Sequence, residues 1–309
     1  MEKKNVALVL SSGGARGIAH IGVIEELLAR GYNITSVAGT SIGAIIGGFY
    51  AAGKLDDYAN WVYSLGLVNV FNLIDFSFSA KGVIKGQKVF KKMSEWMEGL
   101  HFEDLSIPFT CVATDLKNRR ERVFDSGDVL QAMRASISIP GYIEPLLVDD
   151  VFLYDGGIVN PIPLNRVQRK DDDIVVAVDL NTYQPDFDPK RDFKGHEDTE
   201  ASQTLNKVTS MWLNAIKNIE VLQRRTSNEK KKAKEEVNKD KHLTRIGALT
   251  EMFDMMQENI SKQMIAQEAP DILIEIPRNL CSTFEFHKSK ELVEFGRMRA
   301  KMALDMLDC

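Results

Sequence analysis

The stretch VAGTSIGAIIGG, residues 37–48, places one serine between two glycines where a short apolar run gives way to small, helix-forming residues. Ser36–Ala38 predicts a short buried strand, and the residues after Ser41 predict a helix. Gly39, Ser41 and Gly43 together have the spacing G-x-S-x-G of a nucleophile elbow, whose sharp turn exposes a serine hydroxyl at the edge of a sheet. A tight turn without chemistry explains the same three residues equally well.

A second glycine-rich corner precedes this stretch. Val6–Leu10 has the continuous apolar character of a buried parallel strand, and SSGGARG at 11–17 leads into a helical pattern over Ile18–Ala29. Strand, glycine turn and helix therefore occur twice in succession, which predicts an α/β fold with a largely parallel sheet. Further strand-like runs lie at 109–114, 151–154, 174–178 and 272–276, and a closing helix is expected at 292–307.

The two corners are expected to lie together, because neighbouring parallel strands end at the same edge of a sheet, where ligands usually bind. Four backbone amides could then point into one space and stabilise an oxyanion, those of Gly13, Gly14, Ala15 and Ile42. A dinucleotide-binding loop is the alternative. It fits less well, because Ser12 stands at the first glycine of G-x-G-x-x-G and the second strand does not end on an acidic residue.

A catalytic serine needs a base. The hydrolase order Ser…Asp…His leaves three candidate histidines, His196, His242 and His287, none of which follows a strand in an obvious catalytic loop. Three aspartates stand at strand ends, Asp115, Asp155 and Asp179. Asp155 differs because Gly156 and Gly157 would let the chain turn sharply and bring its carboxylate against Ser41, whereas the other two are expected to cap loops or helices. Apolar surroundings that raise its pKa would make Asp155 a better base.

Composition narrows the classes of protein. A net charge of −5 over 309 residues gives no general case for nucleic-acid binding. Three cysteines without a CxxC pair do not form the pattern of a disulfide framework or a zinc site, and they fit a reducing compartment. The apolar run near the N-terminus is too short for a signal peptide, and no stretch reaches the roughly 18 apolar residues of a membrane span. We expect a cytoplasmic protein, with any membrane contact peripheral to the inner face.

Two segments stand apart from the strand and helix pattern. Residues 67–84 are rich in Phe, Ile, Leu and Val, and residues 203–266 hold two helical stripes that could form a cap. Between the stripes, residues 224–241 contain eight basic and four acidic side chains, as expected of a solvated, mobile hairpin tip or of a patch that binds anionic lipid. The 67–84 segment and the Met-rich 252–264 segment could line an acyl channel, or could be ordinary packing.

Four motifs, SGGARG, GTSIG, RASISIPGYIEP and DGGIVNPIP, resemble in order and spacing the bacterial branch of the patatin-like phospholipase family. The resemblance covers roughly residues 5–180, and FEFHKSKELVEFGRMRA near the end also fits. It implies a single three-layer α/β/α domain over 1–309. It also implies a Ser41–Asp155 dyad without histidine, with the Gly13 and Gly14 amides as the oxyanion hole. The motif residues carried over are Ser12, Gly17, Gly39, Gly43, Gly156 and Gly157, of which Ser12 departs from the glycine usual in the family.

The resemblance implies a serine lipid acyl hydrolase that acts on a phospholipid, lysophospholipid or other acyl ester and needs no metal or cofactor. Arg16 matches a basic position of the family, where it could orient a substrate phosphate or brace the glycine loop. Two other functions remain open on the sequence. One is a lipid-binding or regulatory module that kept the fold without activity. The other is an acyltransferase that passes the acyl group to an acceptor other than water.

Overall fold

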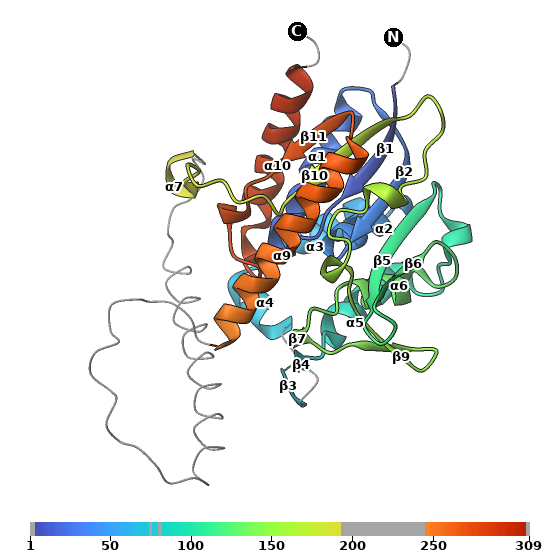
Figure 1. Ribbon diagram of the computed structural model, residues 1–309, viewed down its shortest axis with the longest axis vertical. Coiled ribbons are helices and arrows are strands. Elements are labelled where there is room, and N and C mark those ends of the chain that lie inside the picture. The colour runs from blue at the N-terminus through green and yellow to red at the C-terminus, as the bar shows by residue number, and fades with distance from the viewer. Residues whose placement is uncertain (1–3, 74–75, 80–81, 193–244, 307–309) are drawn as a thin grey trace. The chain divides into compact units, whose positions relative to one another are not determined.

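The computed structural model describes residues 4–73, 76–79, 82–192 and 245–306 (Figure 1). Within these ranges, an eight-stranded sheet has the order β11-β10-β1-β2-β5-β9-β8, and β6 pairs with β5 outside this path. Its strands are β1 (Asn5–Leu10), β2 (Asn33–Thr40), β5 (Phe109–Asp115), β6 (Arg120–Phe124), β8 (Leu146–Val148), β9 (Val151–Asp155), β10 (Ile174–Asp179) and β11 (Ile272–Glu275). A small second sheet joins β3 (Phe76–Ser79), β4 (Gly82–Ile84) and β7 (Gly141–Ile143).

The neighbouring strands from β11 through β10, β1 and β2 to β5 are all parallel, which confirms the mostly parallel sheet. The strand-like runs of the sequence coincide with β1, β5, β9, β10 and β11. β2 is longer than the predicted Ser36–Ala38 because polar side chains in its first half find partners. Asn33 Nδ2 donates to Asn5 Oδ1 at 2.9 Å, and Thr35 Oγ1 donates to Asp173 Oδ2 at 2.8 Å.

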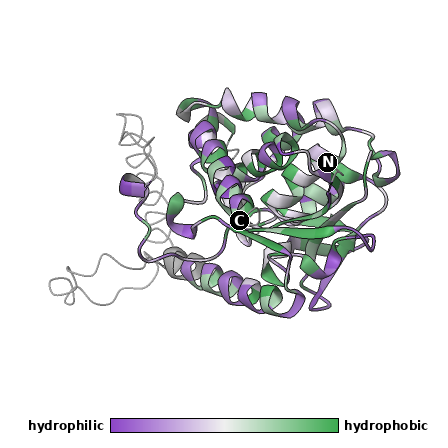
Figure 2. Ribbon diagram, turned by 90° about the horizontal axis from the view of Figure 1, so that it is seen from above, coloured by the Kyte–Doolittle hydropathy of each residue, from purple (hydrophilic) through white to green (hydrophobic). Residues whose placement is uncertain are grey.

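Side-chain alternation along the central strands builds two cores, one on each face of the sheet. Leu8 and Leu10 belong to the larger core, whereas Val9 between them belongs to a smaller one. The larger core receives α1 (Ala19–Ala29), α2 (Ile42–Ala51) and α10 (Ser289–Asp305), and the smaller one receives Met264 and Ile265 of α9 (Arg245–Glu268). Figure 2 shows helices on both sides of the sheet, so the three-layer α/β/α architecture is confirmed.

The register around β5 positions the site. β6 runs along one edge of β5 from Cys111 to Asp115, so β2 and β9 must share the opposite edge. β2 ends there with Thr40 beside Val112, and β9 ends with Asp155 beside the next residue of β5, Ala113. Two strands that are far apart in the sequence, one parallel and one antiparallel to β5, therefore meet end to end.

The remaining α-helices of the described ranges are α3 (Leu55–Tyr63), α4 (Leu67–Leu73), α5 (Gln87–Met97), α6 (Val129–Ser136) and α7 (Pro189–Asp192). None of the helices in the described ranges combines the length and apolarity needed to cross a membrane. Met1–Lys194 and Phe253–Cys309 form one compact unit, which contains the whole site. The second expected helical stripe is α9, whereas the first stripe, most of the expected cap and its 224–241 tip lie outside the described residues, so the domain organisation stays a prediction.

Candidate active site

Ser41 occupies a strained turn between β2 and α2. Its φ of 57° and ψ of −122° lie in a region that residues with side chains seldom adopt. The glycines on either side are required by close packing. A Cβ atom at Gly39 would come within 3.0 Å of the Gly43 carbonyl oxygen, and one at Gly43 would come within 3.0 Å of the Leu10 carbonyl oxygen. The G-x-S-x-G spacing therefore reflects a turn pressed against the end of β1.

The hydroxyl of Ser41 points at a carboxylate. Ser41 Oγ donates a hydrogen bond of 2.6 Å to Oδ2 of Asp155. The other carboxylate oxygen, Oδ1, accepts from the backbone amide of Gly157 at 2.7 Å. The Asp155 backbone carbonyl accepts from Thr114 Oγ1 at 2.7 Å, so the residue is held at both its main chain and its side chain.

Burial governs the charge of this carboxyl. Asp155 is 1% exposed, and its desolvation raises the pKa to about 7, although the hydrogen bonds from Ser41 and Gly157 oppose the shift. A carboxyl whose pKa lies near neutrality can exist in both protonation states under ordinary conditions. Asp155 can therefore accept a proton and return it at neutral pH.

Ser136, at the end of α6, is a site residue that the sequence reasoning missed. Its Oγ accepts a hydrogen bond of 2.8 Å from the Ser41 amide and donates one of 2.6 Å to the Val112 carbonyl. The strained backbone of Ser41 is thereby anchored to β5. Nearby, the carbonyl of Ser138 accepts from the Asp155 amide at 2.9 Å. The sequence signal was the motif RASISIPGYIEP, which holds Ser136 and Ser138, but the motif alone does not show which residues these two serines contact.

The glycine-rich corner lies beside Ser41, as expected. Gly14 lines the same cavity as Ser41 and Ile42. Within the described part of the chain, the amides of Gly13, Gly14 and Ile42 donate to no backbone or side-chain acceptor. The Ala15 amide differs from them, because it donates to the Thr283 carbonyl at 2.8 Å. The expectation that Ala15 joins an oxyanion hole was therefore wrong, because a loop near the C-terminus already uses its N–H.

Gly17 has a packing reason of its own. A Cβ atom at Gly17 would come within 3.0 Å of the Ile42 side chain, at the first turn of α2. Gly156 behaves similarly, since a Cβ there would come within 3.0 Å of the Val112 carbonyl oxygen and of the Thr40 side chain in GTSIG. Both glycines let one motif approach another, so the motifs interlock around Ser41.

Arg16 braces the glycine loop. It is 5% exposed, and its Nη1 donates to the carbonyls of Arg278 at 2.8 Å and Cys281 at 3.3 Å. Burial, reinforced by the neighbouring Arg278, lowers the pKa of the Arg16 guanidinium. Arg278 in turn pairs with Asp254 of α9. Of the two roles considered for Arg16, these contacts favour bracing over phosphate binding.

The other candidate acids are structural. Asp115 accepts hydrogen bonds from Asn118 and Arg120, and Asp179 accepts them from Asn181 and Thr182. The prediction that these two aspartates cap loops is confirmed.

No histidine within the described residues forms a hydrogen bond with Ser41 or Asp155. His287 is one of these histidines, whereas His196 and His242 lie outside the described residues. His20 is fully buried, which lowers its pKa to about 4, and it contacts the Ser11 carbonyl at 3.0 Å. Among the described side chains, Asp155 alone accepts the Ser41 hydroxyl.

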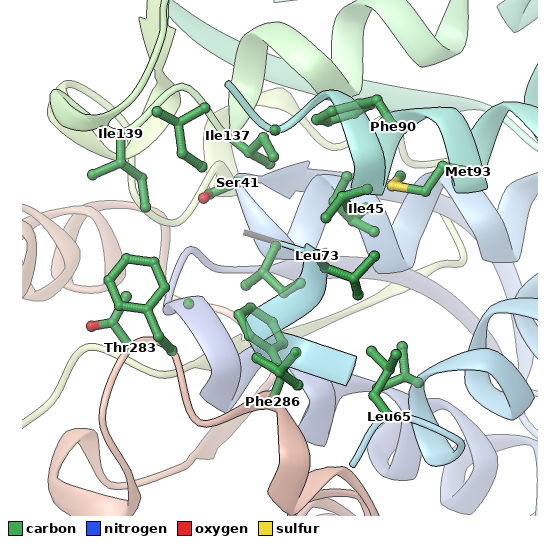
Figure 3. A pocket seen from close by; sticks show the side chains of 18 of the residues that line it. Ser41, Ile45, Leu65, Leu73, Phe90, Met93, Ile137, Ile139, Thr283 and Phe286 are labelled. Carbon is green, nitrogen blue, oxygen red and sulfur yellow. The ribbon is translucent and has the colours of Figure 1, made fainter. Parts of the chain in front are cut away.

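An apolar cavity of about 170 Å³ opens beside Ser41. Figure 3 shows its wall, which is drawn from α2, α3, α4, α5 and the segments around residues 137–143 and 283–286. Val70 and Leu73 line it; for their segment, 67–84, the sequence had left both a channel wall and ordinary packing open. The Met-rich segment of α9 is not among the lining residues described. Three of its methionines, Met252, Met255 and Met256, are at least half-exposed, whereas Met264 packs against the smaller core.

Comparison with known proteins bears on this arrangement. The sequence model described as Patatin-like phospholipase matches residues 8–167, more than half of the chain. Uncharacterized NTE family proteins of Mycobacterium tuberculosis and Mycobacterium bovis are 34% identical to it over 98% of this chain and 92% of theirs. The chain belongs to the patatin-like phospholipase family. The match contains the glycine loop, Ser41 and Asp155, and this membership does not fit a dinucleotide-binding loop at 11–17.

More distant relatives of the chain share only part of their length with it. The protein named Lysophospholipase NTE1 of Coccidioides immitis is 33% identical over 57% of this chain, which is 12% of that protein. Among solved structures, VipD from Legionella pneumophila aligns with a TM-score of 0.48 at 14% identity, covering 99% of this chain and 67% of that one. Both α9 and α10 lie beyond the family match but within the stretch shared with the mycobacterial proteins.

Proposed function

We propose that this protein is a serine lipid acyl hydrolase that cleaves carboxylic esters of fatty acids through Ser41 and Asp155, without a histidine. The observation that carries the proposal is the 2.6 Å hydrogen bond from Ser41 Oγ to a buried carboxylate whose pKa is raised to about 7. Family membership supports lipid hydrolysis in general, and the apolar cavity beside Ser41 supports an acyl substrate.

Acylation is the first half of the proposed reaction. The ionised Asp155 takes the proton of Ser41 while Oγ attacks the ester carbonyl carbon, and the carbonyl oxygen becomes an oxyanion. The amides of Gly13, Gly14 and Ile42 are available to donate to that oxygen, and the N-terminus of α2 adds a favourable dipole. The tetrahedral intermediate then expels the alcohol, which receives the proton from Asp155, and the acyl group stays on Ser41.

Deacylation repeats the same proton transfers with water. Asp155, ionised again, takes a proton from a water molecule that attacks the acyl-serine. The intermediate releases the fatty acid, and the proton returns to Ser41 Oγ. One carboxyl thus serves as base and acid in each half, a task that suits a pKa near neutrality.

Substrate class follows from the cavity and from the relatives. The lining is almost entirely apolar and begins at Ser41 itself, so an acyl chain fits it better than a polar head group does. Several distant relatives are named lysophospholipases, and on that basis we propose phospholipid or lysophospholipid esters as substrates in the cytoplasm.

We also propose peripheral contact with anionic lipid through 224–241. Binding of the full chain to anionic vesicles should weaken as salt rises, and salt-independent or absent binding would contradict it.

Chemical labelling tests the function directly. Purified protein should react with an alkyl fluorophosphonate at Ser41 and hydrolyse nitrophenyl acyl esters without added calcium. Ser41→Ala should abolish both. Ser94→Ala is the matched control, because Ser94 lies partly exposed on α5 and its hydroxyl donates to the Lys91 carbonyl of the same helix.

Two results would replace the proposal. Labelling of Ser41 with no release of fatty acid from any acyl ester would indicate transfer to an acceptor other than water. Lipid binding with neither labelling nor hydrolysis would indicate a module that kept the fold without the activity.

A further inference from the structure

Gln257 is a buried amide on a helix that otherwise carries most of its polar side chains in solvent. It is 5% exposed, whereas Asn259, Gln263 and Gln267 on the same helix, α9, are exposed. A buried side-chain amide costs free energy unless its hydrogen-bonding groups find partners. The partners of Gln257 lie in the two loops that form the proposed site, and neither loop is close to it in the sequence.

The first partner is Ser12. Gln257 Nε2 donates to Ser12 Oγ at 3.2 Å, and Ser12 itself is 1% exposed. Ser12 stands where the resemblance leads one to expect glycine, so this chain carries a buried hydroxyl that needs a partner at that position. Ser12 directly precedes Gly13, and its own amide donates to the Pro161 carbonyl at 2.8 Å. Gln257 therefore holds the residue at which the glycine loop begins.

The second partner is the turn after Asp155. A Cβ atom on Gly157 would lie within 3.0 Å of Gln257 Nε2 and also within 3.0 Å of Asp155 Oδ1. The amide nitrogen and that carboxylate oxygen are therefore no more than about 6 Å apart, a range in which a charge perturbs a pKa. Gly157 also donates its amide to the same Oδ1. Gln257 thus packs on the residue that orients the carboxylate.

We infer that Gln257 is a positioning residue of this site, which holds the oxyanion loop and the Asp155 turn at a fixed separation through Ser12 and Gly157. It donates to neither Ser41 nor Asp155 and acts only through the two loops. The inference rests on the proposed function. It predicts that Ser41 reacts efficiently only when one amide side chain contacts both loops.

The first experiment compares Gln257→Met with Gln263→Met in the full chain. Methionine keeps the length of the side chain and suits a helix, but it cannot donate to Ser12. We expect Gln257→Met to lower kcat, and the rate at which an alkyl fluorophosphonate modifies Ser41, about tenfold, with KM within about twofold of wild type. Gln263→Met should match wild type. Ser12→Ala should lose a similar factor, and the double variant Ser12→Ala, Gln257→Met should lose little more.

A second experiment tests whether residue 257 lies beside the Asp155 carboxylate, as the inference requires. Gln257→Glu is nearly isosteric and places a second carboxyl beside Asp155, so the two should titrate as a coupled pair. We expect the modification of Ser41 to reach its plateau at least about one pH unit higher than in wild type. Gln263→Glu should leave the profile unchanged. An unchanged profile in Gln257→Glu would place residue 257 away from the Asp155 carboxylate and contradict the contact through Gly157.

The outcomes distinguish the two proposals. If wild type is not modified at any pH, the proposed function fails and this inference fails with it. If wild type is modified but Gln257→Met equals Gln263→Met, the inference alone is overturned. The same holds if the losses from Ser12→Ala and Gln257→Met simply multiply, or if Gln257→Glu keeps the wild-type pH profile.

Discussion

The dyad edge of the sheet is held by hydrogen bonds, whereas the cavity beside it is held by packing. At the edge, Ser41, Ser136 and Asp155 each have a named partner at 2.6–2.8 Å. At this edge, Gly39 and Gly43 lack the Cβ atoms that would collide with neighbouring backbone carbonyls. The cavity wall consists almost wholly of aliphatic and aromatic side chains, such as Ile45 and Phe90, which come from several separate segments.

We therefore expect the hydrogen-bonded edge to determine the rate of hydrolysis and the apolar wall to determine which substrates are selected. A hydrogen-bonded edge has one arrangement, and a change there should lower turnover for every substrate. A packed apolar wall can accommodate changes in volume, so a change there should alter which acyl chains fit.

The largest effect is expected from Asp155→Asn. The amide keeps the size of the side chain but cannot take the Ser41 proton, so ester hydrolysis should fall about 10³- to 10⁴-fold. Asp115→Asn is the matched control, since Asp115 is also a buried carboxyl at a strand end but caps a turn. Initial rates on one nitrophenyl ester measure both. Substantial activity in Asp155→Asn would move the base elsewhere.

Next is Gly43→Ala, which tests whether the elbow is held by close packing. The added methyl group would come within 3.0 Å of the carbonyl oxygens of Leu10 and Ser11, and backbone cannot give way easily. We expect a loss of about 3 kcal/mol or more in the free energy of unfolding, at the upper end of overpacking effects. Gly66→Ala meets no atom within 4 Å and should be nearly neutral. Urea denaturation compares them, and equal midpoints would refute the packing argument.

Activity and stability should respond in opposite directions to pH. Asp155 must be ionised to act as a base, so hydrolysis should rise about tenfold per pH unit below 7 and level off above it. The pKa of Asp155 is raised from 3.8 to about 7 in the folded protein, so binding of its proton stabilises the fold. This stabilisation is complete below pH 3.8 and is lost as the pH rises through about 7. The loss amounts to up to about 4 kcal/mol.

The stability half of this prediction has its own control. Asp155→Asn cannot ionise, so its free energy of unfolding should exceed that of wild type by more at pH 8 than at pH 5. Urea denaturation of both proteins at the two pH values measures the difference. Parallel pH dependence in the two proteins would contradict the raised pKa of Asp155.

The nucleophile elbow at Ser41 and the turn after Asp155 could be predicted because a short local sequence pattern indicates each of them. An apolar run followed by glycine, serine and glycine specifies a strand, a turn and a helix wherever it lies in a chain. The two glycines that follow Asp155 indicated a sharp turn there. The parallel strands were predictable for the same reason, because buried strands are continuous apolar runs.

Other parts of the site depend on contacts between distant segments, which no local pattern records. The sequence predicts that the Ala15 amide is free to bind an oxyanion, but this amide donates to the Thr283 carbonyl. Ser136 and Gln257 contact the site from helices that are far from it in the sequence. The methionines of α9 suggested a channel wall by composition. Composition cannot say which face of a helix is turned outward. Met252, Met255 and Met256 are exposed, and Met264 packs against the smaller core.

The smallest effect is expected at the cavity wall, from Leu65→Trp. Figure 3 shows Leu65 across the cavity from Ser41, where only a longer acyl chain would reach it. A larger side chain there should lower kcat/KM about two- to tenfold for long-chain esters and leave short-chain esters unchanged. Leu28→Trp, on the half-exposed surface of α1, is the matched control. An equal fall for every chain length would assign Leu65 to folding, and no change at any length would mean that the acyl chain leaves the site by another route.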